Sequence, residues 1–107
     1  MNPVTIILPT FNDEKIIEKK IFQLSQKLKK KKIKFEILVI NDGSTDGTLK
    51  KIKKIKLDNK KIKLINNKIN LGKSASVKKA LRLTKYDNII ISDSDLPYFE
   101  VFNKILV

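Results

Sequence analysis

The chain has 107 residues, of which 41% are hydrophobic and 33% charged, and it contains no Cys and no His. This composition is typical of one small folded domain, and it excludes thiol nucleophiles, Cys/His zinc sites and a histidine proton shuttle. The formal net charge of +13 would attract nucleic acid or anionic membranes, but Arg82 is the only arginine and Trp is absent. Because proteins that read bases favour Arg and aromatic side chains, we expect no nucleic-acid partner.

Short apolar runs rich in Ile and Val alternate with amphipathic patterns along the chain. They predict strands at 4–8, 35–40, 62–65 and 88–91, helices at 13–30, 48–56 and 74–84, and a last helix that begins near Pro97. In the third helix the residues expected to face the sheet are Val77, Ala80, Leu81 and Thr84. The order favours a single α/β domain over residues 1–107, with a mostly parallel sheet in a Rossmann-like, three-layer αβα arrangement. No segment reaches the roughly 20 apolar residues of a membrane span and no signal peptide is evident, so we expect a cytoplasmic protein.

In a parallel α/β sheet, ligands bind beyond the carboxyl ends of the strands, which directs attention to four loops. The first loop reads PTFNDE and contains no Gly, so it does not support a Rossmann dinucleotide site. Pro9 and Phe11 offer a stiff, partly apolar ledge for a flat base. In the alternative interpretation, Asn12 or Asp13 caps the following helix and Phe11 packs against that helix.

The second loop reads NDGSTDGT and follows a buried strand. Its Gly residues allow positive φ, and its Ser, Thr and Asp residues can cap the next helix, so a structural turn explains most of it. Asp42 has a second interpretation. A carboxylate at the carboxyl end of a buried strand can accept the N–H of uracil or guanine.

The third loop reads NNKINLGKS, and its last three residues resemble the end of a phosphate-binding P-loop. A P-loop needs a Gly at the position of Asn67, so the sequence does not support an NTPase. Lys73 stands at a predicted helix N-terminus, where it could meet a phosphate or remain an ordinary surface residue.

The fourth loop reads SDSDLP and brings two carboxylates, Asp93 and Asp95, one residue apart. Two such groups repel each other unless a cation or hydrogen-bond donors compensate. Mg²⁺ and Mn²⁺ take oxygen ligands and can bridge a carboxylate to a diphosphate, whereas the alternative is an Asp cap on the last helix. The position at the carboxyl end of a strand favours the metal.

Taken together, the stretches VTIILPTFNDE, FEILVINDGSTDGT, NKINLGKSASVKKAL and NIIISDSDLP resemble the N-terminal half of family 2 glycosyltransferases. That resemblance implies the A-type nucleotide-diphospho-sugar transferase fold in a truncated form, with the acceptor half absent. The acidic pair followed by Leu-Pro most resembles the polyprenol-phosphate branch, which makes dolichyl-phosphate mannose or glucose and related lipid-linked sugars.

The resemblance also implies roles for individual residues. Those expected to bind the donor nucleotide are Pro9, Phe11, Asp13, Ile40, Asp42, Lys73, Asp93 and Ser94. Within this set Pro9 and Phe11 would flank the base, Asp42 would bind it, and Ile40 would line its pocket. Asp93 and Asp95 would hold Mg²⁺ or Mn²⁺, and Asp95 would be catalytic.

The function implied is metal-dependent transfer of a hexose from a UDP- or GDP-linked sugar to an acceptor. The branch resemblance suggests a polyprenyl or dolichyl phosphate as acceptor, and the basic surface suggests peripheral binding to an anionic membrane. Two alternatives remain open. One is a donor-binding module without activity of its own, completed by a partner chain or a second copy; the other is a basic nucleic-acid binder.

Overall fold

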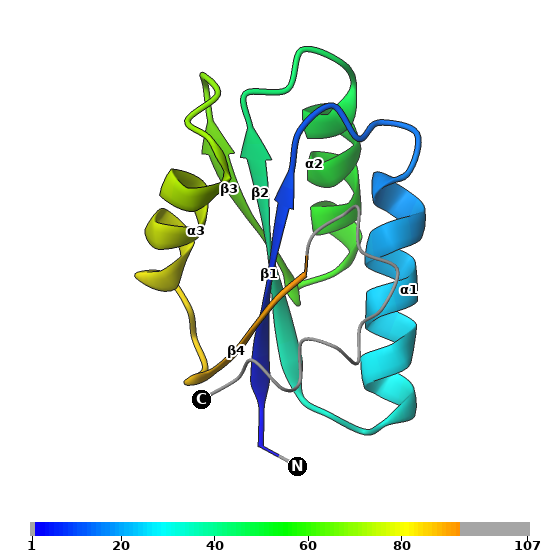
Figure 1. The fold of residues 1–107 in the computed structure, drawn as a ribbon. Coiled ribbons are helices and arrows are strands. Elements are labelled where there is room, and N and C mark those ends of the chain that lie inside the picture. The colour runs from blue at the N-terminus through cyan, green and yellow to red at the C-terminus, as the bar shows by residue number, and fades with distance from the viewer. Residues whose placement is uncertain (1, 93–107) are drawn as a thin grey trace.

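The computed structural model describes residues 2–92 (Figure 1). The elements in this part of the chain are β1 Val4–Thr10, α1 Ile17–Lys30, β2 Phe35–Asp42, α2 Thr48–Asp58, β3 Ile62–Asn67, α3 Lys73–Leu81 and β4 Asn88–Ile91. The strands form one sheet in the order β3-β2-β1-β4, and every pairing is parallel. The predicted α/β class and parallel sheet are confirmed, while the helix predicted near Pro97 lies outside the described residues.

Two apolar cores hold the helices against opposite faces of the sheet, as Figure 1 shows for α1 and α2 on one side and α3 on the other. The larger core joins α1 and α2 to alternate residues of β1 and β2, among them Ile6 and Val39. The smaller core places Ala80 of α3 against Ile7 and Ile40. Because successive strand residues point to opposite faces, strands covered on both sides must be apolar throughout, as β1 and β2 largely are.

The first three strands extend two residues beyond the predicted ends, to Thr10, Asp42 and Asn67. The backbone ladder continues through these polar residues, since Thr10 pairs with Asn41 and Asp42 with Asn67. Hydrophobicity therefore marks the buried part of each strand, whereas pairing decides where it ends. The polar side chains at the carboxyl ends are held on regular strands.

On its other side β1 pairs with β4 as far as Ile7 and Ile91, and the Ser92 N–H adds one bond to the Ile7 carbonyl at 2.8 Å. Two residues further along β1, on the same side, stands Pro9, which has no N–H to donate. The ladder with β4 thus loses a donor just before the carboxyl end of β1.

Two helix boundaries differ from the prediction by three residues or more. Regular α1 begins at Ile17 rather than residue 13. A turn precedes it, in which the Asp13 carbonyl accepts the N–H groups of Ile16 and Ile17. Helix α3 ends at Leu81 rather than residue 84, and Leu81 is exposed instead of facing the sheet. The chain leaves the helix there, and the Lys85 and Tyr86 N–H groups donate to side-chain acceptors on β2 and β1.

Those acceptors form a small buried polar cluster at the amino end of the sheet. The Glu36 carboxylate accepts the Thr5 hydroxyl at 2.8 Å and the Lys85 N–H at 2.6 Å. Thr5 Oγ1 in turn accepts the Tyr86 N–H at 3.2 Å. A buried carboxylate on the second strand thereby fixes the connection that leads from α3 into β4.

We expect Glu36→Ala to lower the free energy of unfolding by about 2 kcal/mol, because the buried Thr5 hydroxyl and the partly buried Lys85 N–H would lose their acceptor. Equilibrium urea unfolding followed by circular dichroism would measure this. Glu18→Ala is the matched control, since its carboxylate is largely exposed and pairs with Lys51 at 3.7 Å, a contact that contributes about 0.5 kcal/mol or less. Equal losses in the two variants would contradict the anchoring role.

Candidate functional site

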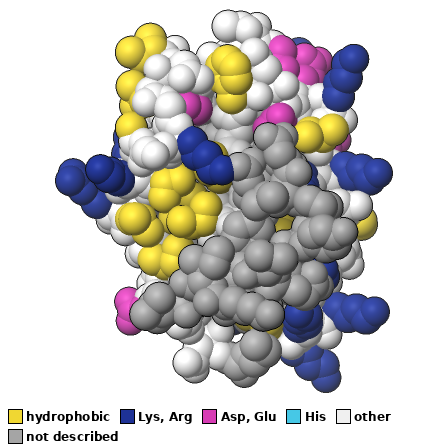
Figure 2. Space-filling model, in the orientation of Figure 1, with side chains coloured by type: hydrophobic (Ala, Val, Ile, Leu, Met, Phe, Trp, Pro, Cys, Tyr) yellow, Lys and Arg dark blue, Asp and Glu magenta, His cyan; other side chains and the backbone are white. Residues whose placement is uncertain are grey.

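Three loops lie together at the carboxyl ends of β1, β2 and β3, at the top of Figure 1, and we call this edge of the sheet the rim. The loops comprise residues 11–16, 43–47 and 68–72. Figure 2, in the same orientation, shows acidic side chains gathered near this end and Lys and Arg along the flanks. The rim therefore combines buried strand ends with most of the acidic groups visible on this face.

The first two loops are joined through Asn12. Its N–H donates to Ser44 Oγ at 2.9 Å, and its side-chain Oδ1 accepts the Thr45 N–H at 2.8 Å. Asn12 itself has φ of 52°, a left-handed conformation that Asn tolerates better than most residues. The alternative in which Asn12 or Asp13 caps α1 is wrong, because no side chain caps α1. The Asn12 side chain instead accepts a hydrogen bond from the second loop.

Two acidic side chains continue this connection. The Gly47 N–H donates to Glu14 Oε1 at 2.7 Å, and the Glu14 N–H donates to Asp46 Oδ2 at 3.2 Å. Partial removal from water would raise the pKa of Asp46, but hydrogen bonds from the hydroxyl and N–H of Thr48 outweigh it and hold that pKa below its usual value. These carboxylates are used to hold the loops together.

The second and third loops are joined through Asp42, which is only 5% exposed. Its Oδ1 accepts the Leu71 N–H at 2.8 Å and the Asn67 side-chain amide at 3.1 Å. Its Oδ2 accepts the Gly72 N–H at 3.0 Å. Burial alone would raise the pKa of Asp42, but the hydrogen bonds from these groups and from Ser76 outweigh it and lower the pKa below 3.8. A carboxylate has about four acceptor sites, so these donors occupy its capacity.

The other residues predicted to bind the sugar donor also lie at the rim, but they differ in exposure to solvent. Pro9 and Ile40 are buried and lie opposite each other in the β1–β2 ladder, and Ile40 packs in the smaller core against α3. Phe11 is 47% exposed, and the Asp13 carboxylate accepts a long bond of 3.4 Å from the Phe11 N–H. Lys73 is exposed at the first residue of α3. The structure thus brings these predicted residues to one end of the sheet.

The acidic motif Asp93, Ser94 and Asp95 lies outside the described residues. Within residues 2–92 no group of three or more Asp, Glu, His or Cys side chains could hold a metal ion. The metal prediction therefore depends on side chains that directly follow Ser92, whose backbone is held beside β1.

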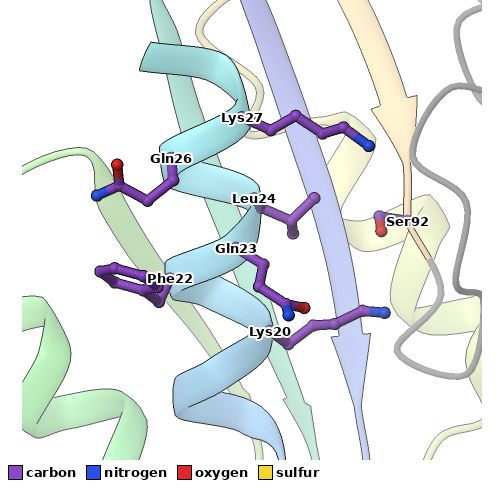
Figure 3. A pocket seen from close by; sticks show the side chains of 7 residues that line it. All are labelled: Lys20, Phe22, Gln23, Leu24, Gln26, Lys27 and Ser92. Carbon is purple, nitrogen blue, oxygen red and sulfur yellow. The ribbon is translucent and has the colours of Figure 1, made fainter. Parts of the chain in front are cut away.

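A cavity of about 450 Å³ lies between α1 and Ser92 (Figure 3). Its lining consists of Lys20, Phe22, Gln23, Leu24, Gln26, Lys27 and Ser92. In Figure 3 the Lys20 and Lys27 side chains extend from α1 toward the side on which Ser92 lies. Within residues 2–92, none of the residues predicted to bind the sugar donor lines this cavity, so the cavity is a feature of the α1 flank.

The sequence interpretation missed three residues that shape the rim: Asn12 as a link between loops, Glu14 as the acceptor for Gly47, and Asn67 beside Asp42. Their partners are 25 to 33 positions away in the chain. The only local signal was the density of Asn and Asp after each strand, which indicates a polar rim without assigning partners.

Comparison with known proteins identifies the class to which this fold and rim belong. The family model for Glycosyl transferase family 2 matches residues 5–100, nearly the whole chain. The chain therefore belongs to glycosyl transferase family 2.

Among characterised sequences, the chain is 34% identical to poly-β-1,6-N-acetyl-D-glucosamine synthase of Staphylococcus aureus over 106 residues, covering 94% of this chain and 25% of that protein. Among solved structures, it resembles a mannosyltransferase from Pyrobaculum calidifontis in complex with GDP-Man and Mn²⁺, with a TM-score of 0.74, 25% identity and coverage of 95% of this chain and 31% of that one. It also resembles S. aureus TarS in complex with UDP-GlcNAc, with a TM-score of 0.71, 29% identity and coverage of 87% and 26%. The chain thus spans about a quarter to a third of these relatives.

Two rim glycines provide a test of how closely the loops approach each other. Both have positive φ, 73° for Gly43 and 90° for Gly72. A Cβ added to Gly43 would lie 2.4 Å from the backbone nitrogen of Asn70, whereas one added to Gly72 would meet nothing within 4 Å. The second loop therefore packs directly on the backbone of the third.

We expect Gly72→Ala to cost about 1 kcal/mol of unfolding free energy from backbone strain, and Gly43→Ala to cost about 3 kcal/mol because a clash adds to the same strain. The two variants are matched in substitution and in the sign of φ. Equilibrium urea unfolding would measure both. Similar losses would show that the close approach at Gly43 is unimportant.

Proposed function

We propose that this chain binds a nucleoside diphosphate sugar, with uridine or guanosine as the base, and takes part in transfer of the sugar to an acceptor. The observation that carries the proposal is the family match to residue 100, which includes both the rim loops and the acidic motif. Related structures with GDP-Man and with UDP-GlcNAc support this class of donor. Residues 1–107 then form the nucleotide-sugar-binding half of a glycosyltransferase domain.

The rim offers suitable groups for the donor. Phe11 presents an exposed aromatic side chain beside Pro9, which suits packing against a base. Asp13 has the acidic side chain least committed to other loops, and it stands next to this ledge. Asp42 reads the base N–H in this proposal, and Lys73 meets the diphosphate near the N-terminus of α3, where the helix dipole favours an anion.

Mg²⁺ or Mn²⁺ fits the chemistry of the acidic motif, since carboxylate oxygens are the ligands that these ions prefer. We assign Asp93 and Asp95 to hold the metal, Ser94 to contact the donor, and Asp95 to act in catalysis. A bound metal would supply charge stabilisation to the departing diphosphate. The Mn²⁺ present in the Pyrobaculum structure supports a divalent ion without distinguishing the two metals.

We propose a polyprenyl or dolichyl phosphate as the acceptor. Such an acceptor arrives already anionic and needs no strong base, which suits a chain without His. Within residues 2–92 no helix is long and apolar enough to cross a bilayer. In this proposal the basic surface guides contact with the lipid head groups. Poly-β-1,6-N-acetyl-D-glucosamine synthase is a synthase of a different product, and a transfer assay with a polyprenyl phosphate decides whether this chain uses the lipid acceptor.

A second candidate function is a donor-binding module that needs a partner chain or a second copy for activity. One observation favours it. Within the described residues β4 pairs with a strand on one side only. An edge strand of this kind can accept a strand from another chain.

We expect UDP or GDP and their sugars to raise the melting temperature of the chain, and Mn²⁺ to increase that shift. A ligand at a hundred times its dissociation constant adds roughly 2.7 kcal/mol of stability, which a thermal-shift assay detects readily. Asp95→Ala should remove the metal-dependent part, whereas Asp87→Ala, the same change just before β4, should not. A metal-dependent shift that persists in Asp95→Ala would refute the assigned role.

We expect flotation with liposomes to increase with the fraction of anionic lipid and to fall with added salt, because exposed Lys side chains would bind the acidic head groups. Vesicles of neutral lipid are the control. Adding a polyprenyl phosphate together with a radiolabelled nucleotide sugar would test transfer in the same samples. Binding that ignores anionic lipid content would contradict the membrane proposal.

A further inference from the structure

Behind Asp42 lies a chain of polar side chains that reaches the surface of α3. The Asn67 side-chain Nδ2 donates to Asp42 Oδ1 at 3.1 Å and to Ser76 Oγ at 3.0 Å. The Lys79 ammonium donates to Asn67 Oδ1 at 2.9 Å. Asp42, Asn67 and Ser76 are each at most 5% exposed, whereas Lys79 is at the surface.

The direction of the hydrogen bonds in this chain is fixed by its two ends. An ammonium group can only donate and an ionised carboxylate can only accept. The Asn67 amide must therefore turn its oxygen to Lys79 and its nitrogen to Asp42, since the opposite orientation would place donor against donor and acceptor against acceptor. Lys79 and Asp42 thus both hold the Asn67 amide in the orientation that turns its nitrogen to the carboxylate.

This arrangement bears on ligand binding because the acceptor capacity of Asp42 is already in use. A base N–H that binds there must share or replace one of the present bonds. The N–H groups of Leu71 and Gly72 belong to the backbone of the loop, so their positions are fixed by it. The side chains of Asn67 and Ser76 also donate to Asp42, and they influence the orientation of its carboxylate and its strength as an acceptor.

We propose that Asn67 and Lys79 are positioning residues for donor binding, which orient Asp42 and keep its carboxylate ionised and ready to accept the base. This inference rests on the proposed function, because it assumes that Asp42 meets the base. Neither residue touches the ligand in the proposal. They act through Asp42, and a purely structural role, in which they only tie β3 to α3, is the competing explanation.

Other charged groups stand near the same end of the sheet and must be kept unchanged in a test. They are Asp13 and Glu14 of the first loop, Asp46 of the second, Lys68 of the third and Lys73 of α3. Lys78 provides a matched control for Lys79, because it is the neighbouring exposed lysine of the same helix and makes no bond to Asn67.

The experiment compares the full chain with the variants Lys79→Met, Lys78→Met and Asn67→Asp. Calorimetry would measure the dissociation constants of UDP and GDP in the presence of Mn²⁺. Carbon-13 NMR would follow the Asp42 carboxyl as the pH is lowered, which reports its ionisation directly and without nucleotide. Melting temperatures would show whether each variant is folded.

We expect Lys79→Met to weaken nucleotide binding roughly fivefold and to raise the pH at which Asp42 titrates, because Asn67 loses one of the two partners that orient it. Asn67→Asp should raise that pH further, since a second carboxylate would then stand beside Asp42. Lys78→Met should change neither quantity.

The inference is overturned if Lys79→Met matches Lys78→Met in both affinity and Asp42 titration, or if Lys79→Met lowers only the melting temperature. Failure of the proposed function gives a different result. In that case the unaltered chain binds neither nucleotide, while the NMR titration still reveals whether Lys79 and Asn67 control the carboxylate.

Discussion

The rim depends on the close approach of the turn after β2 to the loop after β3. Gly43 allows the two backbones to meet at Asn70, and the Asp42 carboxylate then accepts the next two N–H groups of that loop, from Leu71 and Gly72. These bonds fix the residue from which α3 starts. Because α3 alone covers one face of the sheet within residues 2–92, the smaller core is aligned by the same contact.

The charge distribution follows from the same use of carboxylates. The chain carries a net +13, yet Glu14, Asp42 and Asp46 all stand at the rim. Each of them accepts at least one backbone N–H from a neighbouring loop, so its negative charge is partly neutralised by local dipoles. An anionic donor can therefore approach these acids at lower cost than their number suggests, with Lys73 and a divalent ion in the acidic motif supplying positive charge in the proposed site.

The sequence predicted the order of elements because buried parallel strands and amphipathic helices leave strong hydrophobic patterns, as in β1 and α1. It could not predict that β2 continues to Asp42, since the pairing of Asp42 with Asn67 depends on a strand 25 positions away. The same limit explains the wrong cap at Asn12, whose partners lie in the second loop. Local patterns name the residues of a polar rim, whereas their partners are set by the topology that brings the loops together.

The bonds that join the three rim loops all connect residues of the described part of the chain, from Asn12 to Ser76. None of them needs β4, which adds to the sheet on the far side of β1 from β2. The geometry that would receive a base is thus built by the first three strands and their helices, whereas the acidic motif follows the fourth strand. In the proposed site, recognition of the base therefore relies on the first three strands and the metal on the motif after the fourth, so we expect a variant that loses the metal-dependent step to retain the rim.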